Sequence, residues 1–538
     1  MIALPVLLPL LLAALVLVPG RGGAWAFRAL PLASLPALWM ALLPPDAMAW
    51  PWLLLGLRLA VDEFGQAMLL LIGLAWTASA WFASSRIEAS RPRFALFWLL
   101  ALAGLCQSVL AAELAGFYLG YVAMTLAAYG LVVHDGGNAA RHAGRVYLIM
   151  AFLGEALVLS GLLMLGAHYG NIELAALPAD LVHMPTPLTG ALLLAGFAVK
   201  MGIVPLHLWL PVAHPIAPVP ASAILSGVIV KAGLLGALRL VPGESFGAAV
   251  PLTALLAVGL FTAFYGVAAG LGQARPKTVL AYSTVSQMGL LFCGLALAMH
   301  EPALRALLPL LILHHGLNKA ALFLAMGCGA AATRWRLALL VLPALSLAAA
   351  PFTGGALAKL GLKTALDGAG LGEGVIALLS LSSAATALLM LHLLARVRAQ
   401  GATGAMHAAW PLLTAAGLVL PWWLARRAGI DLRPDVPAVW DALWPLLLAA
   451  LIHAAWRRLR RPHLAVPEGD LLVPVQRLLA TLTGWLTRLP RLHVPSWPQD
   501  LPARVETPMR RIEQRLATLP MAGLLLLLLV LALRVVLR

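Results

Sequence analysis

Residues 192–240, LLLAGFAVKMGIVPLHLWLPVAHPIAPVPASAILSGVIVKAGLLGALRL, decide how this chain folds. They hold two apolar runs, each long enough to cross a bilayer, with Lys200 near the middle of the first and Lys231 near the middle of the second. An ionisable side chain at bilayer depth costs about 2.5–3.5 kcal/mol, so its presence indicates a function. Five prolines lie between the lysines, and proline frees backbone carbonyls that are tolerated where they line a polar cavity. The stretch therefore predicts a path for a proton or a small cation.

The composition of the whole chain indicates a polytopic membrane protein. Of 538 residues, 62% are hydrophobic and 11% are charged, whereas a soluble protein has about 25% charged residues. The three cysteines fall in apolar runs without metal-ligand spacing, and the sequence has no P-loop or dinucleotide motif. We therefore expect no catalytic residue, cofactor or metal site in this chain.

The net charge of +16 is better explained by membrane orientation than by nucleic-acid binding. Most arginines lie in short loops between apolar runs, where they indicate a cytoplasmic face and contact with anionic lipid. The positive-inside rule places both termini on the outer face, although a loop with Arg426, Arg427 and Arg433 departs from the pattern. We expect a multi-pass protein of the bacterial inner (cytoplasmic) membrane that binds the lipid bilayer and no nucleic acid.

Runs of about 18–25 apolar residues predict an all-α fold of about 14–16 transmembrane helices. The stretch 50–64, WPWLLLGLRLAVDEF, is predicted to be a surface loop or hairpin. The expected organisation is N-terminal helices in 1–90, a first repeat in 91–245, a second repeat in 246–400, additional helices in 401–456, a cytoplasmic amphipathic linker in 457–518 and a final helix in 519–538.

The linker 457–518 contains two stretches with apolar residues at helical spacing and basic residues opposite, separated by a proline-rich break. One interpretation is a segment lying on the cytoplasmic membrane surface. The other is a lateral brace that ties the last helix to neighbouring subunits. The sequence leaves both open.

Few other polar residues lie deep in the apolar runs. Glu155 interrupts one run and needs either a partner or a proton. His314, His315 and Lys319 share another run, and the spacing of four places His315 and Lys319 on one helical face, which favours a proton relay.

A second proline-broken run is followed by Lys359, with Lys363 one turn further on. Lys363 lies near a helix end, where a lysine often extends to the headgroups instead of serving transport. Two proline-broken helices, each with a lysine near the break and each in a block of about five spans, are typical of an internally repeated transporter. His207 and His214 between the first two lysines are interpreted by default as helix–helix hydrogen-bonding residues.

Four stretches then resemble one protein family. They are FAVKMGIVPLHLWLPVAHPIAPVPASAILSGVIVKAG, RPKTVLAYSTVSQMG, HHGLNKAALFLAMG and PFTGGALAK, in this order. Over about residues 60–400 the chain is similar to the antiporter-like subunits of respiratory complex I, a family that includes Mrp-type antiporter subunits, membrane-bound hydrogenase subunits and the membrane subunit of an inorganic-carbon uptake system.

The resemblance implies two inverted five-helix repeats and a series of proton-carrying residues. It places Lys200 in one half-channel and Lys231 in a connecting relay. His315 and Lys319 match a further relay, and Lys359 matches the exit half-channel. Expected partners are other membrane and peripheral subunits, and the expected cargo is protons, with Na⁺ or K⁺ as coupled cations in the antiporter case.

One position departs from the family pattern. The family has a glutamate on its fifth helix that pairs with the lysine matched by Lys200, and here Val122 stands at that position. Glu155 or Glu113 could replace it.

These observations leave three functions open. The first is a proton-translocating subunit of a complex related to NADH:quinone oxidoreductase and Mrp, and the alternative is a subunit of proton-driven inorganic-carbon uptake. The third is a scaffold with an inactive path, against which the cost of so many deep lysines argues.

Overall fold

The computed structural model describes residues 1–18, 20–174, 186–241, 250–401, 404–427, 435–458, 466–474 and 481. The chain divides into two units, Met1–Val473 and Pro474–Arg538, and the first contains nearly all of the described residues.

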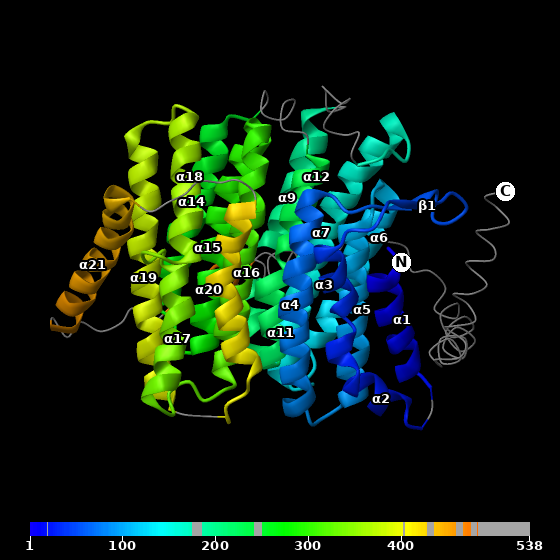
Figure 1. The fold of residues 1–538 in the computed structure, drawn as a ribbon, viewed down its shortest axis with the longest axis horizontal. Helices are drawn as coiled ribbons and strands as arrows, with labels where there is room; N and C mark the ends of the chain where they lie inside the picture. The colour runs from blue at the N-terminus through cyan, green and yellow to red at the C-terminus, as the bar shows by residue number, and fades with distance from the viewer. Residues whose placement is uncertain are drawn as a thin grey trace, which may run out of the picture. The chain divides into compact units, whose positions relative to one another are not determined.

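Within the first unit the helices stand side by side (Figure 1), and ten of the described helices are long and apolar enough to cross a membrane. The count is eleven if the bent pair Gly22–Arg28 and Leu30–Leu42 forms one span. The prediction of an all-α polytopic membrane protein is thus confirmed. The helices are α1 (Leu4–Val16), α2 (Gly22–Arg28), α3 (Leu35–Leu42), α4 (Glu63–Arg86), α5 (Arg91–Leu110), α6 (Leu114–Val132), α7 (Asn138–Tyr169), α9 (Pro187–Met201), α10 (Leu210–Ile216), α11 (Val219–Ile224), α12 (Lys231–Leu240), α14 (Leu252–Leu271), α15 (Pro276–His300), α16 (Leu307–Met326), α17 (Arg334–Leu347), α18 (Gly354–Gly368), α19 (Glu373–Gln400), α20 (Ala409–Arg427) and α21 (Val436–Arg458), with short segments η1 (Leu30–Leu32), η2 (Leu225–Ile229) and η3 (Pro302–Ala306).

In each of the predicted regions 1–90, 91–245, 246–400 and 401–456 the described residues are mainly helical. The predicted final helix in 519–538 and most of the predicted linker 457–518 lie outside the described residues. The predicted hairpin is present as the antiparallel strands β1 (Met48–Trp50) and β2 (Leu57–Leu59).

The first helix break separates α9 from α10. At its start Gly202 adopts a left-handed backbone with φ of +73°, and a Cβ there would lie 2.7 Å from the Leu210 side chain. Glycine is the residue that takes this conformation at no steric cost. Pro205 follows, and because it has no backbone N–H it cannot resume the helical hydrogen bonds. A turn therefore precedes α10.

The second break separates α17 from α18. Pro351 lies in it, and the flanking Ala349 and Phe352 both have positive φ values, of 60° and 62°. Such conformations cost about 1–3 kcal/mol each for non-glycine residues and persist where the surrounding structure enforces them. The Thr353 side chain then caps the new helix by accepting from the Ala356 N–H. Both predicted proline-broken helices are present, while the inverted relation between the two blocks remains a prediction.

The centre of the bundle is formed by α15 and α16, which are completely buried along their spans. Close packing there depends on glycine, because a Cβ at Gly316 of α16 would lie 2.6 Å from the carbonyl oxygen of Gly227 in η2. Small residues allow membrane helices to approach this closely. This contact joins the segment that carries Lys231 to the helix that carries Lys319.

Candidate functional site

Lys200 lies in the last turn of α9, beside the first break, and its side chain is only 7% exposed. Its Nζ lies 3.7 Å from the Glu155 carboxylate and donates a hydrogen bond of 2.5 Å to the Thr125 hydroxyl. That hydroxyl in turn donates to Glu155 at 2.7 Å. The ring of Tyr121 faces the ammonium, with its centroid 5.0 Å from Nζ. Residues of three helices, α6, α7 and α9, thus form one buried charged cluster.

This cluster places an acid beside Lys200 although Val122 occupies the family's acidic position. Glu155 comes from α7, and Thr125, one turn after Val122 on α6, contacts both charged groups. A cavity of about 10 Å³ borders Glu155 and Lys200, close to the room that a single water needs. The second candidate acid, Glu113, instead caps α6 by accepting from the Gly116 N–H, and burial raises its pKa.

Lys231 and Lys319 are connected through hydrogen-bonding groups of α15 and η2. In the wide turn of η2, the Val230 N–H donates to the carbonyl five residues earlier. The Ser226 carbonyl in the same turn accepts from Lys231 Nζ at 2.6 Å. The Ser226 hydroxyl lies 2.7 Å from that of Thr284, which donates to the Leu280 carbonyl. Lys319 donates to the same carbonyl at 3.0 Å.

Neither of these two lysines has an ion pair with a carboxylate within the described part of the chain. Both side chains are fully buried.

The predicted histidines have different surroundings. His315 lies one turn before Lys319 on α16, and neither of its ring nitrogens has a hydrogen-bond partner among the described residues. His314 contacts Asn318 and Ser346 at 3.3 and 3.4 Å. The ring nitrogens of His214 have no hydrogen-bond partner in the described ranges, and the ring stacks on that of Phe323.

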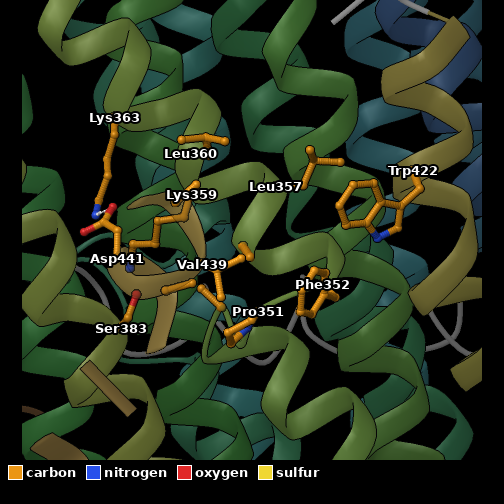
Figure 2. Close-up of a pocket in the computed structure, with 14 residues that line it drawn as sticks. Pro351, Phe352, Leu357, Lys359, Leu360, Lys363, Ser383, Trp422, Val439 and Asp441 are labelled. Carbon is orange, nitrogen blue, oxygen red and sulfur yellow. Dashed lines mark hydrogen bonds and ion pairs between the residues drawn. The ribbon is translucent and has the colours of Figure 1, made fainter. Parts of the chain in front are cut away.

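Lys359 and Lys363 lie on α18, after the second break, and line a cavity of about 40 Å³ (Figure 2). Lys359 donates to the Ser382 hydroxyl of α19 at 2.6 Å. Lys363 forms an ion pair with Asp441 of α21, drawn as a dashed line in Figure 2. Lys363 therefore contacts a protein carboxylate, whereas a lysine near a helix end often extends to the lipid headgroups.

No pattern in the sequence predicts the position of Asp470. It follows α21 in the predicted linker, yet it reaches the first break, where it lies 3.1 Å from His207 Nε2 and accepts from the Tyr265 hydroxyl at 2.7 Å. Burial alone would raise the pKa of Asp470. The hydrogen bonds from His207 and Tyr265 have the larger effect, so the pKa of this carboxyl lies below that of a free aspartate. The sequence alone does not mark Asp470, Asp441 or Thr125, because only the packing brings them to the lysines and His207.

Among the described residues, no group of three or more histidine, cysteine or acidic side chains is arranged to hold a metal ion. The structure thus contains three groups of titratable side chains within a helical bundle: the cluster at Lys200, the pair Lys231 and Lys319, and the pair Lys359 and Lys363.

This chain is similar in sequence and in fold to known proteins. Residues 111–384 match the family described as NADH:quinone oxidoreductase/Mrp antiporter, transmembrane. The hydrogenase-4 component B of Escherichia coli (strain K12) is 30% identical over 38% of this chain and 32% of its own length. An NAD(P)H-quinone oxidoreductase chain 4 of Synechococcus sp. (strain JA-2-3B'a(2-13)) is 33% identical over 50% of this chain and 51% of its own. The matched region spans only about a third to a half of these relatives.

Two solved structures share the fold. A chain of the membrane-bound sulfane sulfur reductase, an archaeal respiratory membrane complex, superposes with a TM-score of 0.67 at 20% identity, covering 84% of this chain and 99% of that one. A chain of the Mrp complex from Dietzia sp. DQ12-45-1b gives 0.65 at 24% identity, covering 84% and 98%.

Proposed function

Because the chain belongs to the NADH:quinone oxidoreductase/Mrp antiporter transmembrane family, we propose that it is a proton-translocating subunit of a multi-subunit membrane complex. The relatives are named as subunits of quinone oxidoreductases and a hydrogenase, which supports assembly with other subunits. In this proposal a partner subunit supplies the energy for transport.

The observation that carries the proposal is the buried cluster of Lys200, Glu155 and Thr125. At 3.7 Å the two charges stabilise each other, and in a poorly solvated interior the interaction is much stronger than in water. A charge arriving nearby, or a proton taken up by Glu155, changes the protonation equilibrium of Lys200, since the two groups titrate as a coupled pair. The cluster can therefore bind and release a proton in response to its neighbours.

The remaining lysines supply the later steps of the proposed path. Lys231 and Lys319 are linked through hydroxyl and carbonyl groups at the centre of the bundle, and His315 lies one turn from Lys319. Lys359 lies beside the small cavity next to α18. Repulsion among neighbouring ammonium groups passes a change at one lysine to the next.

Proton flux into liposomes tests the proposal. The purified protein is reconstituted with a pH-sensitive dye inside the vesicles, and a potential is applied with K⁺ and valinomycin. Wild-type protein is expected to acidify or alkalise the lumen according to the sign of the potential, and Lys200→Ala is expected to abolish the flux while remaining inserted. Arg145→Ala, an exposed charge change on α7, is the matched control. Equal flux in the wild type and Lys200→Ala would overturn the assignment, and no flux in any protein would favour the scaffold.

We further propose the inner (cytoplasmic) membrane, both termini on the outer face, and coupling to protons with or without Na⁺ or K⁺. Gentle detergent extraction followed by mass spectrometry identifies the partners. Flavin, iron–sulfur or hydrogenase-type subunits would support a redox-driven complex, and further antiporter-type subunits a cation-coupled one. Nothing in the comparisons favours the inorganic-carbon alternative, which a single large zinc-binding partner would restore.

A further inference from the structure

A cavity of about 920 Å³ lies between α14, α19 and α21, away from the lysines of the proposed path. Its walls are mainly apolar and include Leu271, Leu388, Leu391 and Ile452. Helix α21 lies at the edge of the bundle beside α19 (Figure 1), and few of its residues are buried. The cavity separates the end of α21 from α14.

One end of this cavity is strongly basic. Arg396 and Arg398 come from the last two turns of α19, and Arg457 comes from the last turn of α21. No carboxylate lines the cavity, and none of the three arginines forms an ion pair among the described residues. The arginines stand where these helices end, at the level of a membrane surface, and the positive-inside rule makes it the cytoplasmic one.

We propose that this cavity binds one anionic phospholipid, whose headgroup phosphate contacts the three arginines and whose acyl chains cover the apolar walls. Two other occupants fit the cavity less well. A soluble anion would not cover the apolar walls, and an apolar helix would leave the three arginines without a counter-charge. Basic pockets between transmembrane helices on the cytoplasmic side suit anionic headgroups, and the volume lies near the upper end of ordinary ligand pockets.

The lipid has a structural consequence that is independent of the proton path. Because α21 contacts the bundle mainly along α19, a lipid between α21 and α14 holds its end in place. The same helix carries Asp441, the partner of Lys363. The bound phospholipid therefore stabilises the C-terminal end of α21, whereas Asp441 lies near the other end of the helix.

The test uses the full-length protein, delipidated in mild detergent, with native mass spectrometry and thermal unfolding as readouts. Phosphatidylglycerol is compared with phosphatidylcholine and with inorganic phosphate. The variant is Arg396→Gln/Arg398→Gln/Arg457→Gln, and the matched control is Arg21→Gln/Arg28→Gln/Arg145→Gln, which removes equal charge elsewhere. Each basic residue near a surface strengthens anionic lipid binding by about fivefold, so the triple variant should lose roughly a hundredfold in affinity.

A second pair of variants guards against misfolding. Arg396→Lys/Arg398→Lys/Arg457→Lys keeps the charge and should retain most of the binding, whereas Ala268→Trp fills the apolar part and should weaken it without any charge change. Retained phosphatidylglycerol binding in the glutamine variant would overturn the proposal. So would equal binding of phosphatidylcholine by the wild type, or stabilisation by inorganic phosphate that matches the effect of the lipid.

Discussion

The ammonium of Lys200 lies 3.7 Å from the carboxylate of Glu155, and the two residues come from the packed helices α9 and α7. We expect Glu155→Gln to reduce proton flux in liposomes by at least about tenfold, because the amide cannot take up the proton or stabilise the charged lysine. Glu113→Gln is the control, since Glu113 caps α6 and does not contact Lys200. Normal flux in Glu155→Gln would remove Glu155 from the path.

The same pair predicts a thermodynamic coupling. Removing one partner of a buried ion pair leaves the other charge uncompensated, at a cost of about 3–5 kcal/mol. The double variant Glu155→Gln/Lys200→Gln should therefore unfold at a higher temperature than the less stable of the two single variants. Thermal melting of all four proteins in one detergent measures this cycle. Strictly additive effects would show that the two charges do not interact.

Thr125 offers a more delicate test, because its hydroxyl contacts both charged groups. Thr125→Val keeps the shape of the side chain and removes the hydroxyl, so flux should fall by about tenfold while expression and insertion are unchanged. Thr125→Ser retains the hydroxyl and should stay near the wild-type rate. Equal rates in the valine and serine variants would mean that the hydroxyl plays no part.

Stability at acidic pH should depend on Asp470. Its pKa is lowered in the folded protein, so its contribution is fully present above the unfolded value of about 3.9 and is lost as the pH falls through the lower folded value. The groups facing it are His207, Tyr265 and Tyr282. Asp470→Asn should flatten the fall in melting temperature below about pH 4, while the exposed Asp367→Asn should not. Identical pH profiles for wild type and Asp470→Asn would contradict this.

Close packing at the centre gives a prediction about glycine. Gly316→Ala would bring a Cβ to within 2.6 Å of the Gly227 carbonyl oxygen, and overpacking of this kind costs about 1–3 kcal/mol. We expect a lower melting temperature and slower flux, since Lys231 and Lys319 lie on either side of this contact. Gly166→Ala on α7, where a Cβ would meet nothing within 4 Å, is the control. A Gly316→Ala protein as stable as that control would refute the packing argument.

The sequence predicted the helices and their two breaks because apolar runs and proline act locally. It also predicted buried positions for Lys200 and Lys231, since charge inside an apolar run is visible without a fold. It could not predict that Asp470 lies beside His207, 263 residues earlier in the chain. An apolar helix face can pack against many other apolar faces, so the composition of an apolar run does not predict which helices are in contact. Glu155 was predicted as a candidate, but its distance from Lys200 depended on the packing of α7 on α9.

The Leu280 carbonyl accepts from Lys319, and the Thr284 hydroxyl that leads toward Lys231 donates to the same oxygen. A peptide oxygen has no proton of its own to hand on, so this connection between the two lysines is not an unbroken wire. In the proposed function, each of the two lysines would hold its proton independently, and a proton would pass between them only when a neighbouring group moves. That movement limits the rate at which an applied potential drives protons through the protein.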